Sequence, residues 1–165
     1  MKKTLCMALL AAALGAHAQQ PQTPSADAQQ AQKMAAVKKL YAAYAKSKEP
    51  ALDESLFTPD FRAALAHERK AAKKAGGAAC LDYDFIIQGQ DVDSAEVART
   101  LALELAAEGR VKASFRNFDE PVTLHYVLAC TPAGGCLIDD IIEAEGSFKQ
   151  GLRRCLQEQF PKVQP

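Results

Sequence analysis

The sequence predicts an α+β domain in which N-terminal helices pack on one face of a curved antiparallel sheet of about four strands, with a helix closing the C-terminal end. Three observations support this fold class. Apolar residues recur at helical spacing between residues 34 and 75, they alternate with polar residues from Val111 onward, and the helical period returns after Ser147. Helices followed by a run of strands are typical of a layered α+β domain.

The first helix is predicted to begin at Met34 and to extend for about three turns. Its apolar stripe consists of Met34, Val37, Leu40, Tyr41 and Tyr44. Pro50 stops anything longer, because proline lacks the backbone N–H that a helix interior needs. The helix is therefore amphipathic, with one face available for packing.

The second helix begins at Thr58-Pro59-Asp60. Thr58 can cap the free amides of the first turn, and proline is favoured at the first helical position. Gly76-Gly77 provides the stop. The outer face of this helix is basic, and we expect His67, among charged neighbours, to face solvent. The inner face is formed by Phe61, Leu65 and Ala72.

Residues 80–91 are predicted to be a connector with a short apolar core, Phe85-Ile86-Ile87. Residues 96–106 fit two structures. Leucines at 101, 103 and 105 alternate with less apolar residues, as in a strand, whereas Val97 and the leucines at 101 and 105 recur every four residues, as in a helix. Helix propensity favours the second reading. We predict a strand, because the segment that follows alternates clearly.

Three further strands are predicted at Val111–Phe118, Val122–Cys130 and Cys136–Ala144. The first two are joined by a turn that contains Asp119 and Pro121. A closing helix begins near Ser147, which can cap it. Its inner face is formed by Phe148, Leu152, Cys155 and Leu156.

Residues 1–18 have the features of a secretory signal peptide. Lys2 and Lys3 form a basic start, an apolar run extends from Leu5 to Leu14, and small residues precede a cleavage site after Ala18. The apolar run is too short for a stable membrane span. We therefore expect cleavage after Ala18 and a periplasmic or secreted protein.

The mature chain is predicted to contain one domain. Residues 19–32 are rich in Gln, Ala and Pro and are expected to form a flexible lead-in. Residues 33–160 then form a single α+β domain, and residues 161–165 form a tail.

The mature chain is also nearly neutral. The full sequence has 20 basic and 20 acidic residues, and loss of the signal peptide removes two lysines and no acid, which leaves a net charge of −2. Without a basic block, neither nucleic acid nor an anionic membrane surface is an expected partner. No later apolar run is long enough to span a bilayer, so no stable membrane anchor is expected after cleavage.

Four cysteines remain in the mature chain: Cys80, Cys130, Cys136 and Cys155. An even number in a secreted chain indicates disulfides, and the absence of a C-x-x-C motif argues against both a zinc site and a redox relay. Five residues separate Cys130 from Cys136, which suits a hairpin loop that sets them opposite each other. Cys80 would then pair with Cys155, although four cysteines allow two other pairings. No metal and no cofactor is expected.

The Cys130–Cys136 pairing would fix the register of the last hairpin. Counting back, Leu128 would face Ile138, Tyr126 would face Asp140, and Leu124 would face Ile142. Asp140 would then be a carboxylate on an apolar wall opposite a phenol, an arrangement that suits a pocket acid. The alternative, which we favour, is a structural Asp140 bonded to Tyr126 or to backbone.

The opposite face of the same hairpin carries a second polar pair. His125 and Asp139 could meet there diagonally. A histidine beside an aspartate in a sheet more often stabilises the fold than catalyses a reaction, so these two residues are weak binding candidates.

Several segments together resemble a bacterial secreted family known as "domain of unknown function 3828". They are "FTPDF", "FIIQGQD", "VKASFRN", "VTLHYVLA", "LIDDII" and "SFKQGLRRCL". The resemblance covers about residues 34–157, and its most telling motifs are Gln90-Asp91 and Asp139-Asp140-Ile141. Relatives often carry tryptophan where this chain has Cys136.

This resemblance implies a nuclear-transport-factor-2-like (cystatin-like) cone, in which helices pack in a strongly curved antiparallel sheet. It assigns no catalytic residue, because such folds carry enzymes, ligand binders and interaction modules alike. We expect Gln90 and Asp91 to close the connector through side-chain-to-backbone bonds, with a role in ligand binding as the alternative.

The sequence favours a small, non-enzymatic periplasmic binding or interaction protein with a protein partner. An immunity-type protein that blocks a cell-wall-targeting toxin is one specific form of this class. The alternative is a cone-fold small-molecule binder, hydrolase or isomerase that uses Asp140 with Tyr126. A weaker hypothesis is a glycan hydrolase that uses Glu143 and Glu145 as paired acids.

Overall fold

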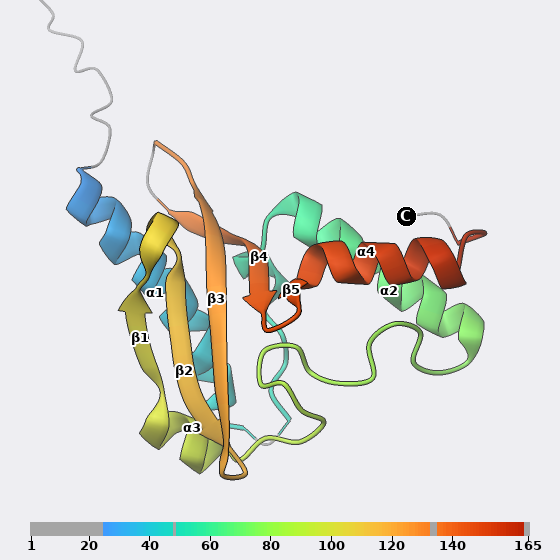
Figure 1. The fold of residues 1–165 in the computed structure, drawn as a ribbon, viewed down its shortest axis with the longest axis horizontal. Helices are drawn as coiled ribbons and strands as arrows, with labels where there is room; N and C mark the ends of the chain where they lie inside the picture. The colour runs from blue at the N-terminus through green and yellow to red at the C-terminus, as the bar shows by residue number, and fades with distance from the viewer. Residues whose placement is uncertain (1–24, 48, 133–134, 164–165) are drawn as a thin grey trace, which may run out of the picture.

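A computed structural model describes residues 25–47, 49–132 and 135–163; the predicted signal peptide and the start of the lead-in lie outside these residues. The predicted α+β class is confirmed (Figure 1), with five antiparallel strands in the order β1-β2-β3-β4-β5 rather than about four. The elements are α1 (Ala26–Tyr44), η1 (Glu54–Leu56), α2 (Pro59–Ala75), α3 (Ser94–Thr100), β1 (Ala102–Leu105), η2 (Ala107–Gly109), β2 (Val111–Asn117), β3 (Glu120–Cys130), β4 (Cys136–Glu143), β5 (Gly146–Ser147) and α4 (Phe148–Gln159).

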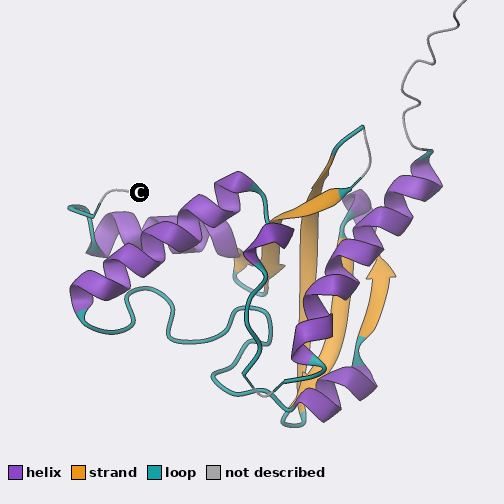
Figure 2. Ribbon diagram, turned by 180° about the vertical axis from the view of Figure 1, so that it is seen from behind, coloured by secondary structure: helices purple, strands orange, loops and turns teal. Residues whose placement is uncertain are grey.

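The helices form two groups around the sheet. Helix α1 lies across one face of the strands, as Figure 2 shows, and contacts β1 to β4. Helices α2 and α4 lie side by side and extend away from the sheet beyond β4 and β5 (Figures 1 and 2). We call this pair the helical arm. Within the described residues, no helix is long and apolar enough to cross a membrane.

Helix α1 begins two turns earlier than predicted. Ser25 caps it by accepting a hydrogen bond from the amide of Ala28 (3.3 Å), and the helix includes residues 26–32 of the expected lead-in. Residues 26–31 are exposed, so this part buries no apolar surface. The next turn is tied to the sheet, because Lys33 donates to the carbonyl of Gly109 (2.8 Å) and Gln32 accepts from the amide of Gly135 (3.3 Å).

Helix α2 has the predicted start and stop. Thr58 Oγ1 accepts from the amide of Phe61 (3.3 Å), and Gly76 ends the helix with φ of 76°, a conformation that favours glycine.

The prediction that His67 on α2 faces solvent is wrong. Its ring is half-buried and Nε2 lies 2.6 Å from the carbonyl oxygen of Val163. Residues 161–163 of the predicted tail therefore fold back onto α2, and Val163 packs against the core.

The prediction of one strand over residues 96–106 is half wrong. The segment is helical as far as Thr100 and extended only from Ala102. Asp93 caps α3 by accepting from the amide of Glu96 (3.0 Å), and Val97 is fully buried at its centre. The helical spacing and the strand-like alternation therefore both reflect real structure, the first as far as Thr100 and the second from Ala102. The hydroxyl of Thr100 then accepts from the amide of Arg116 (2.9 Å) on β2, which fixes the change from helix to strand.

The hydrophobic core joins two aromatic clusters. Under α1, Tyr41 packs edge-on against Phe115 and Tyr126, with ring centroids 5.3 and 6.1 Å apart. Between the connector and the helical arm, Phe85 stacks on Phe148 at 4.3 Å. The apolar core of the connector, residues 85–87, is buried as predicted and lies in the same core cluster.

Both predicted disulfides are present. Cys130 and Cys136 are paired across β3 and β4, with Cα atoms 4.0 Å apart. Cys80 and Cys155 are 75 positions apart in the sequence and tie the connector to α4. Disulfides of this kind are typical of proteins that fold in an oxidising, non-cytoplasmic compartment.

The long disulfide is expected to contribute more stability than the short one. The chain-entropy relation gives about 4.5 kcal/mol for closing the 80–155 loop and about 2.4 kcal/mol for the 130–136 loop. Replacing Cys80 and Cys155 together by serine should therefore lower the free energy of unfolding more than replacing Cys130 and Cys136 together. Urea denaturation of the two double variants under oxidising conditions checks this, and equal losses would contradict it.

Candidate functional site

The predicted pairing of Tyr126 with Asp140 is wrong, because β4 contains a bulge. The register runs as expected from Cys130 opposite Cys136 to Leu128 opposite Ile138, and then shifts. Beyond the shift, Asp140 lies opposite Val127 and Tyr126 lies opposite Ile141, so the predicted Leu124–Ile142 pairing is lost as well. Asp139 is the extra residue. A bulge of this kind places one unpaired residue in a strand and changes which side chains meet.

Asp140 has a structural role at the start of α4. Its carboxylate is 9 % exposed and accepts hydrogen bonds from the Ser147 hydroxyl and from the amides of Ile141 (2.8 Å) and Lys149 (3.1 Å). A carboxylate is favourable there, because the amides at a helix N-terminus carry a partial positive charge. This arrangement agrees with the backbone-bonded alternative from the sequence.

Tyr126 belongs to the core. Its side chain is fully buried, and its hydroxyl lies 2.8 Å from the hydroxyl of Tyr41, which also donates to the carbonyl of Ile86 (3.4 Å). Burial raises the pKa of Tyr126 well above its ordinary value of 10.0. The Tyr126 hydroxyl is inaccessible to a substrate. Its contact with the Tyr41 hydroxyl gives each of these two buried polar groups a hydrogen-bond partner.

His125 and Asp139 are not brought together. His125 is half-buried in the centre of the sheet, between Lys112 and Ile142. Asp139 instead accepts from the hydroxyl of Thr58 (2.9 Å) and pairs with Lys149 (3.2 Å). The bulge residue thus joins β4 to the start of α2.

A different phenol and carboxylate meet where α1 ends against the connector. The hydroxyl of Tyr44 donates to Asp84 Oδ2 (2.7 Å), and Asp84 Oδ1 accepts from the amide of Ile86 (2.8 Å). The backbone of Asp84 also pairs with that of Gly89, with the amide of Asp84 2.8 Å from the carbonyl of Gly89. The aspartate is therefore held in place by both its side chain and its backbone.

This pair lies in the wall of a wide, open depression with a volume of about 590 Å³. We call it the connector pocket. It is lined by Tyr44, Leu52, Ala78, Leu81, Asp82, Tyr83, Asp84, Phe85 and Gln90. Gln90, predicted as a weak binding candidate, is among these residues. Asp91 is not, and its carbonyl accepts from the side-chain amide of Asn117 (2.9 Å).

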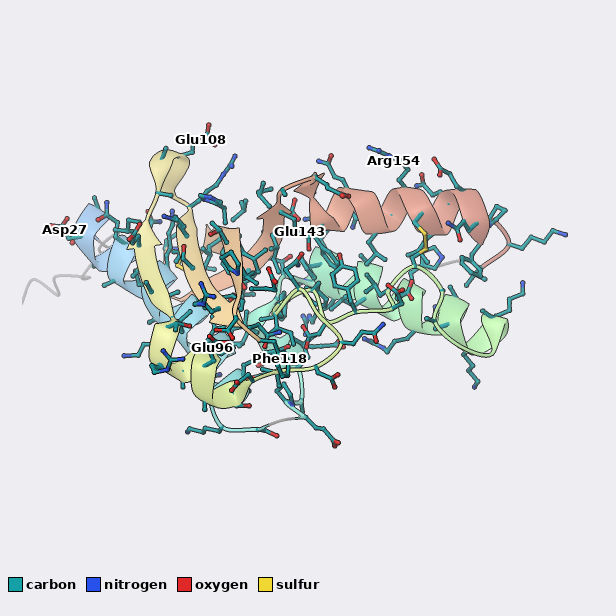
Figure 3. The ribbon with its side chains drawn as sticks, turned by 60° about the horizontal axis from the view of Figure 1, so that its bottom comes forward. Asp27, Glu96, Glu108, Phe118, Glu143 and Arg154 are labelled. Atoms are coloured by element: carbon teal, nitrogen blue, oxygen red, sulfur yellow. A yellow bond between two sulfur atoms is a disulfide. The ribbon has the colours of Figure 1, made fainter. Side chains whose placement is uncertain are left out.

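A second hollow of about 300 Å³ adjoins the connector pocket and shares Leu81 and Tyr83 with it. Its lining includes Glu143 and Glu145, the acids of the glycan-hydrolase hypothesis, and also Arg154. In Figure 3, Glu143 arises from the end of β4 and Arg154 from α4. Glu143 accepts from the side-chain amide of Gln88 (2.7 Å) and from the hydroxyl of Tyr83 (3.5 Å).

Among the described residues, the charged ones that line the two hollows are mostly acidic: Asp82, Asp84, Glu143 and Glu145, with Arg154 as the one basic residue. Burial raises the pKa of Asp84 above its ordinary value of 3.8, and burial likewise raises the pKa of Glu143. Burial and then the charge of Glu143 raise the pKa of Tyr83 to about 12. The connector itself, residues 80–91, has three aspartates and no basic residue. Groups of this kind favour a positively charged ligand.

Sequence reasoning missed Tyr44 and Asp84 as a pair. Tyr44 was assigned to the apolar stripe of the first helix, and Asp84 to a connector of unspecified structure. A signal was present in the run Asp82-Tyr83-Asp84, where two acids flank an aromatic residue. Only the fold brings the end of α1 to this run.

Within the described residues, no group of three or more histidine, cysteine or acidic side chains is placed to hold a metal ion. No protein-family model, no curated protein and no solved structure matches the chain. The resemblance to the family of unknown function therefore stays a prediction.

Replacement of Asp140 is expected to cost stability. Asp140→Ala leaves the buried amide of Lys149 and the Ser147 hydroxyl without their acceptor, which should lower the free energy of unfolding by about 1–3 kcal/mol. Urea denaturation measures the loss. A variant as stable as the wild type would contradict the structural role.

Asp84 is expected to make stability depend on pH in a defined direction. Its pKa is raised in the folded protein, so the folded state binds the proton more tightly and stability rises as the pH falls from 7 towards 3.8. Asp84→Asn removes this contribution. The unfolding free energy of the wild type should therefore increase relative to that of Asp84→Asn as the pH falls, measured by urea denaturation at several pH values. A difference that is constant or shrinks would contradict the raised pKa.

Proposed function

We propose that this protein is an exported, non-enzymatic binding protein that takes an organic cation into the connector pocket. The observation that carries the proposal is the lining of the pocket. It combines the carboxylates of Asp82 and Asp84 with the rings of Tyr44 and Tyr83, and its lining residues include no basic side chain. Pockets with a few converging polar groups on an apolar and aromatic wall are the usual form of a ligand site.

The proposal that the protein is exported rests on two observations. The first is the signal-peptide pattern of residues 1–18, with cleavage after Ala18 and release into the periplasm. The second is the presence of two disulfides, which need an oxidising compartment. The proposal also keeps the family resemblance and its cone fold, which agree with helix α1 lying across the face of an antiparallel sheet.

The expected ligand carries an amine or guanidinium group. Asp84 is desolvated, so a cation beside it gains more than it would beside an exposed carboxylate. The faces of aromatic rings attract cations as well, and Tyr83 lies between the acids of the connector pocket and Glu143. A polyamine or the basic side chain of a peptide can lie in an open depression of about 590 Å³.

Binding is favoured over acid–base catalysis by the hydrogen bonds of Asp84. Both of its oxygens already accept, one from Tyr44 and one from the amide of Ile86. A general base becomes a neutral carboxyl when it takes the proton of its substrate, and a neutral carboxyl accepts hydrogen bonds more weakly, so the bonds that hold the connector would weaken. The negative charge of Asp84, in contrast, acts on a cation without any such loss.

Titration of the oxidised mature chain, residues 19–165, with spermidine tests the proposal. Asp82 is exposed, so Asp82→Asn should keep the fold and weaken binding about two- to five-fold, as expected for a partly screened ion pair. Tyr83→Leu should weaken binding by a similar factor through the lost cation–π contact. Isothermal titration calorimetry measures both, and chemical shifts of residues 80–90 locate the ligand.

Asp27→Asn is the matched control, because Asp27 is an exposed acid at the far end of α1 (Figure 3). It should leave spermidine binding unchanged. Equal weakening by Asp27→Asn and Asp82→Asn would mean that the polyamine responds only to net charge, and the proposed pocket would be wrong. No binding to the wild type would also overturn the proposal for this class of ligand.

A further inference from the structure

The turn between β2 and β3 has a conformation that its residues disfavour. Asn117 and Glu120 are paired, so the turn consists of Phe118 and Asp119 alone, with φ values of 51° and 64°. Two-residue turns with both φ values positive normally carry Asn-Gly or Asp-Gly. A bulky aromatic residue with positive φ is an outlier. The ring of Phe118 is 58 % exposed, so burial does not compensate for the unfavourable backbone.

The turn is held in place by α3. The carboxylate of Glu96, only 5 % exposed, accepts from the amide of Asp119 (2.9 Å). Arg116 pairs with Glu96 (3.5 Å) and also donates to the carbonyl of Asp119. Figure 3 shows Glu96 and Phe118 near each other at one end of the sheet.

The connector holds the same turn from a second direction. The side-chain amide of Asn117 donates to the carbonyl of Asp91 (2.9 Å), and its oxygen accepts from the amide of Asp93 (2.9 Å). Phe118 is therefore presented on a fixed backbone. A turn whose backbone is already ordered loses less entropy on binding than a flexible one.

The charges beside Phe118 are acidic. Asp119 has a side chain that is 93 % exposed, and Glu120 is exposed next to it. Arg116, two residues before Phe118, is already paired with Glu96 and Asp119. The tip of the hairpin is thus an aromatic ring with an acidic rim.

The helical arm carries a groove of the opposite character. Its volume is about 470 Å³, enough for a phenyl ring, and its lining is Ala63, Ala64, His67, Arg153, Leu156, Gln157, Phe160, Pro161 and Val163. An adjoining hollow shares Phe160, Pro161 and Val163 and adds Lys74 and Lys162. The groove is therefore apolar with a basic rim.

We propose that the hairpin tip of one copy docks in the helical-arm groove of a second copy, with the Phe118 ring in the groove and Asp119 and Glu120 towards Lys74 and Lys162. The β2–β3 turn and the helical arm lie at different ends of the fold (Figures 1 and 2), so a tip does not reach the groove of its own arm. The contact is head-to-tail, so a pair of copies keeps one free tip and one free groove. Such contacts build rings or open chains rather than closed two-fold dimers. This inference does not depend on the connector pocket.

Sedimentation of the oxidised mature chain over a wide concentration range tests the proposal. The weight-average mass of the wild type should rise with concentration without stopping at the dimer. Phe118→Asn removes the ring and supplies a residue that tolerates positive φ, so it should abolish association without lowering the melting temperature. A merely structural Phe118 would give the reverse result, a lower melting temperature with association unchanged.

Ala63→Asp tests the groove from the other side. Ala63 is exposed on α2, so the variant should fold and should remain monomeric, whereas the control Ala35→Asp on the exposed side of α1 should associate like the wild type. A mixture of Phe118→Asn and Ala63→Asp should form one-to-one dimers, because each supplies the surface that the other lacks. A wild type that stays monomeric at all concentrations, or a mixture that does not associate, would overturn the proposal.

Discussion

The bulge in β4 is the constraint on which the rest of the structure depends. Because Asp139 is one extra residue in β4, the side chains of Asp139 and Asp140 contact different helices. Asp139 accepts from Thr58 at the start of α2, and Asp140 accepts from the amide of Lys149 in the first turn of α4. The two helices of the arm are thereby fixed to the same strand at their N-termini, where negative charge is favourable. Lys149, buried between Asp60 and Asp139, completes the link.

Buried carboxylates are used throughout the fold to hold backbone amides. Glu68 on α2, 6 % exposed, accepts from the amides of Cys80 and Leu81, so it positions the connector next to the Cys80–Cys155 disulfide. Glu96 does the same for the β2–β3 turn. Hydrogen bonds of this kind offset the loss of water around a buried charge. The pKa of Asp84 is nevertheless raised, because burial outweighs its hydrogen bonds.

Two surfaces therefore differ from the rest of the molecule. The connector pocket concentrates carboxylates around Tyr83, and the β2–β3 turn exposes Phe118 on a braced but unfavourable backbone. Neither arrangement is needed to fill the core. Residues that a fold keeps in a conformation they disfavour are often part of a binding site.

The sequence by itself determined the α+β class, through its helical and alternating periods, and the capped start of α2 at Thr58, because these depend on neighbours along the chain. It favoured the observed pairing of the cysteines but left two other pairings open. It did not determine the bulge at Asp139. One added residue moved Asp140 away from Tyr126, and alternation cannot reveal such a shift. Nor did it reveal the contact between Tyr44 and Asp84, which are 40 positions apart. Contacts at that distance along the chain are decided by how helices and sheet pack, so only the tertiary structure could place the candidate site.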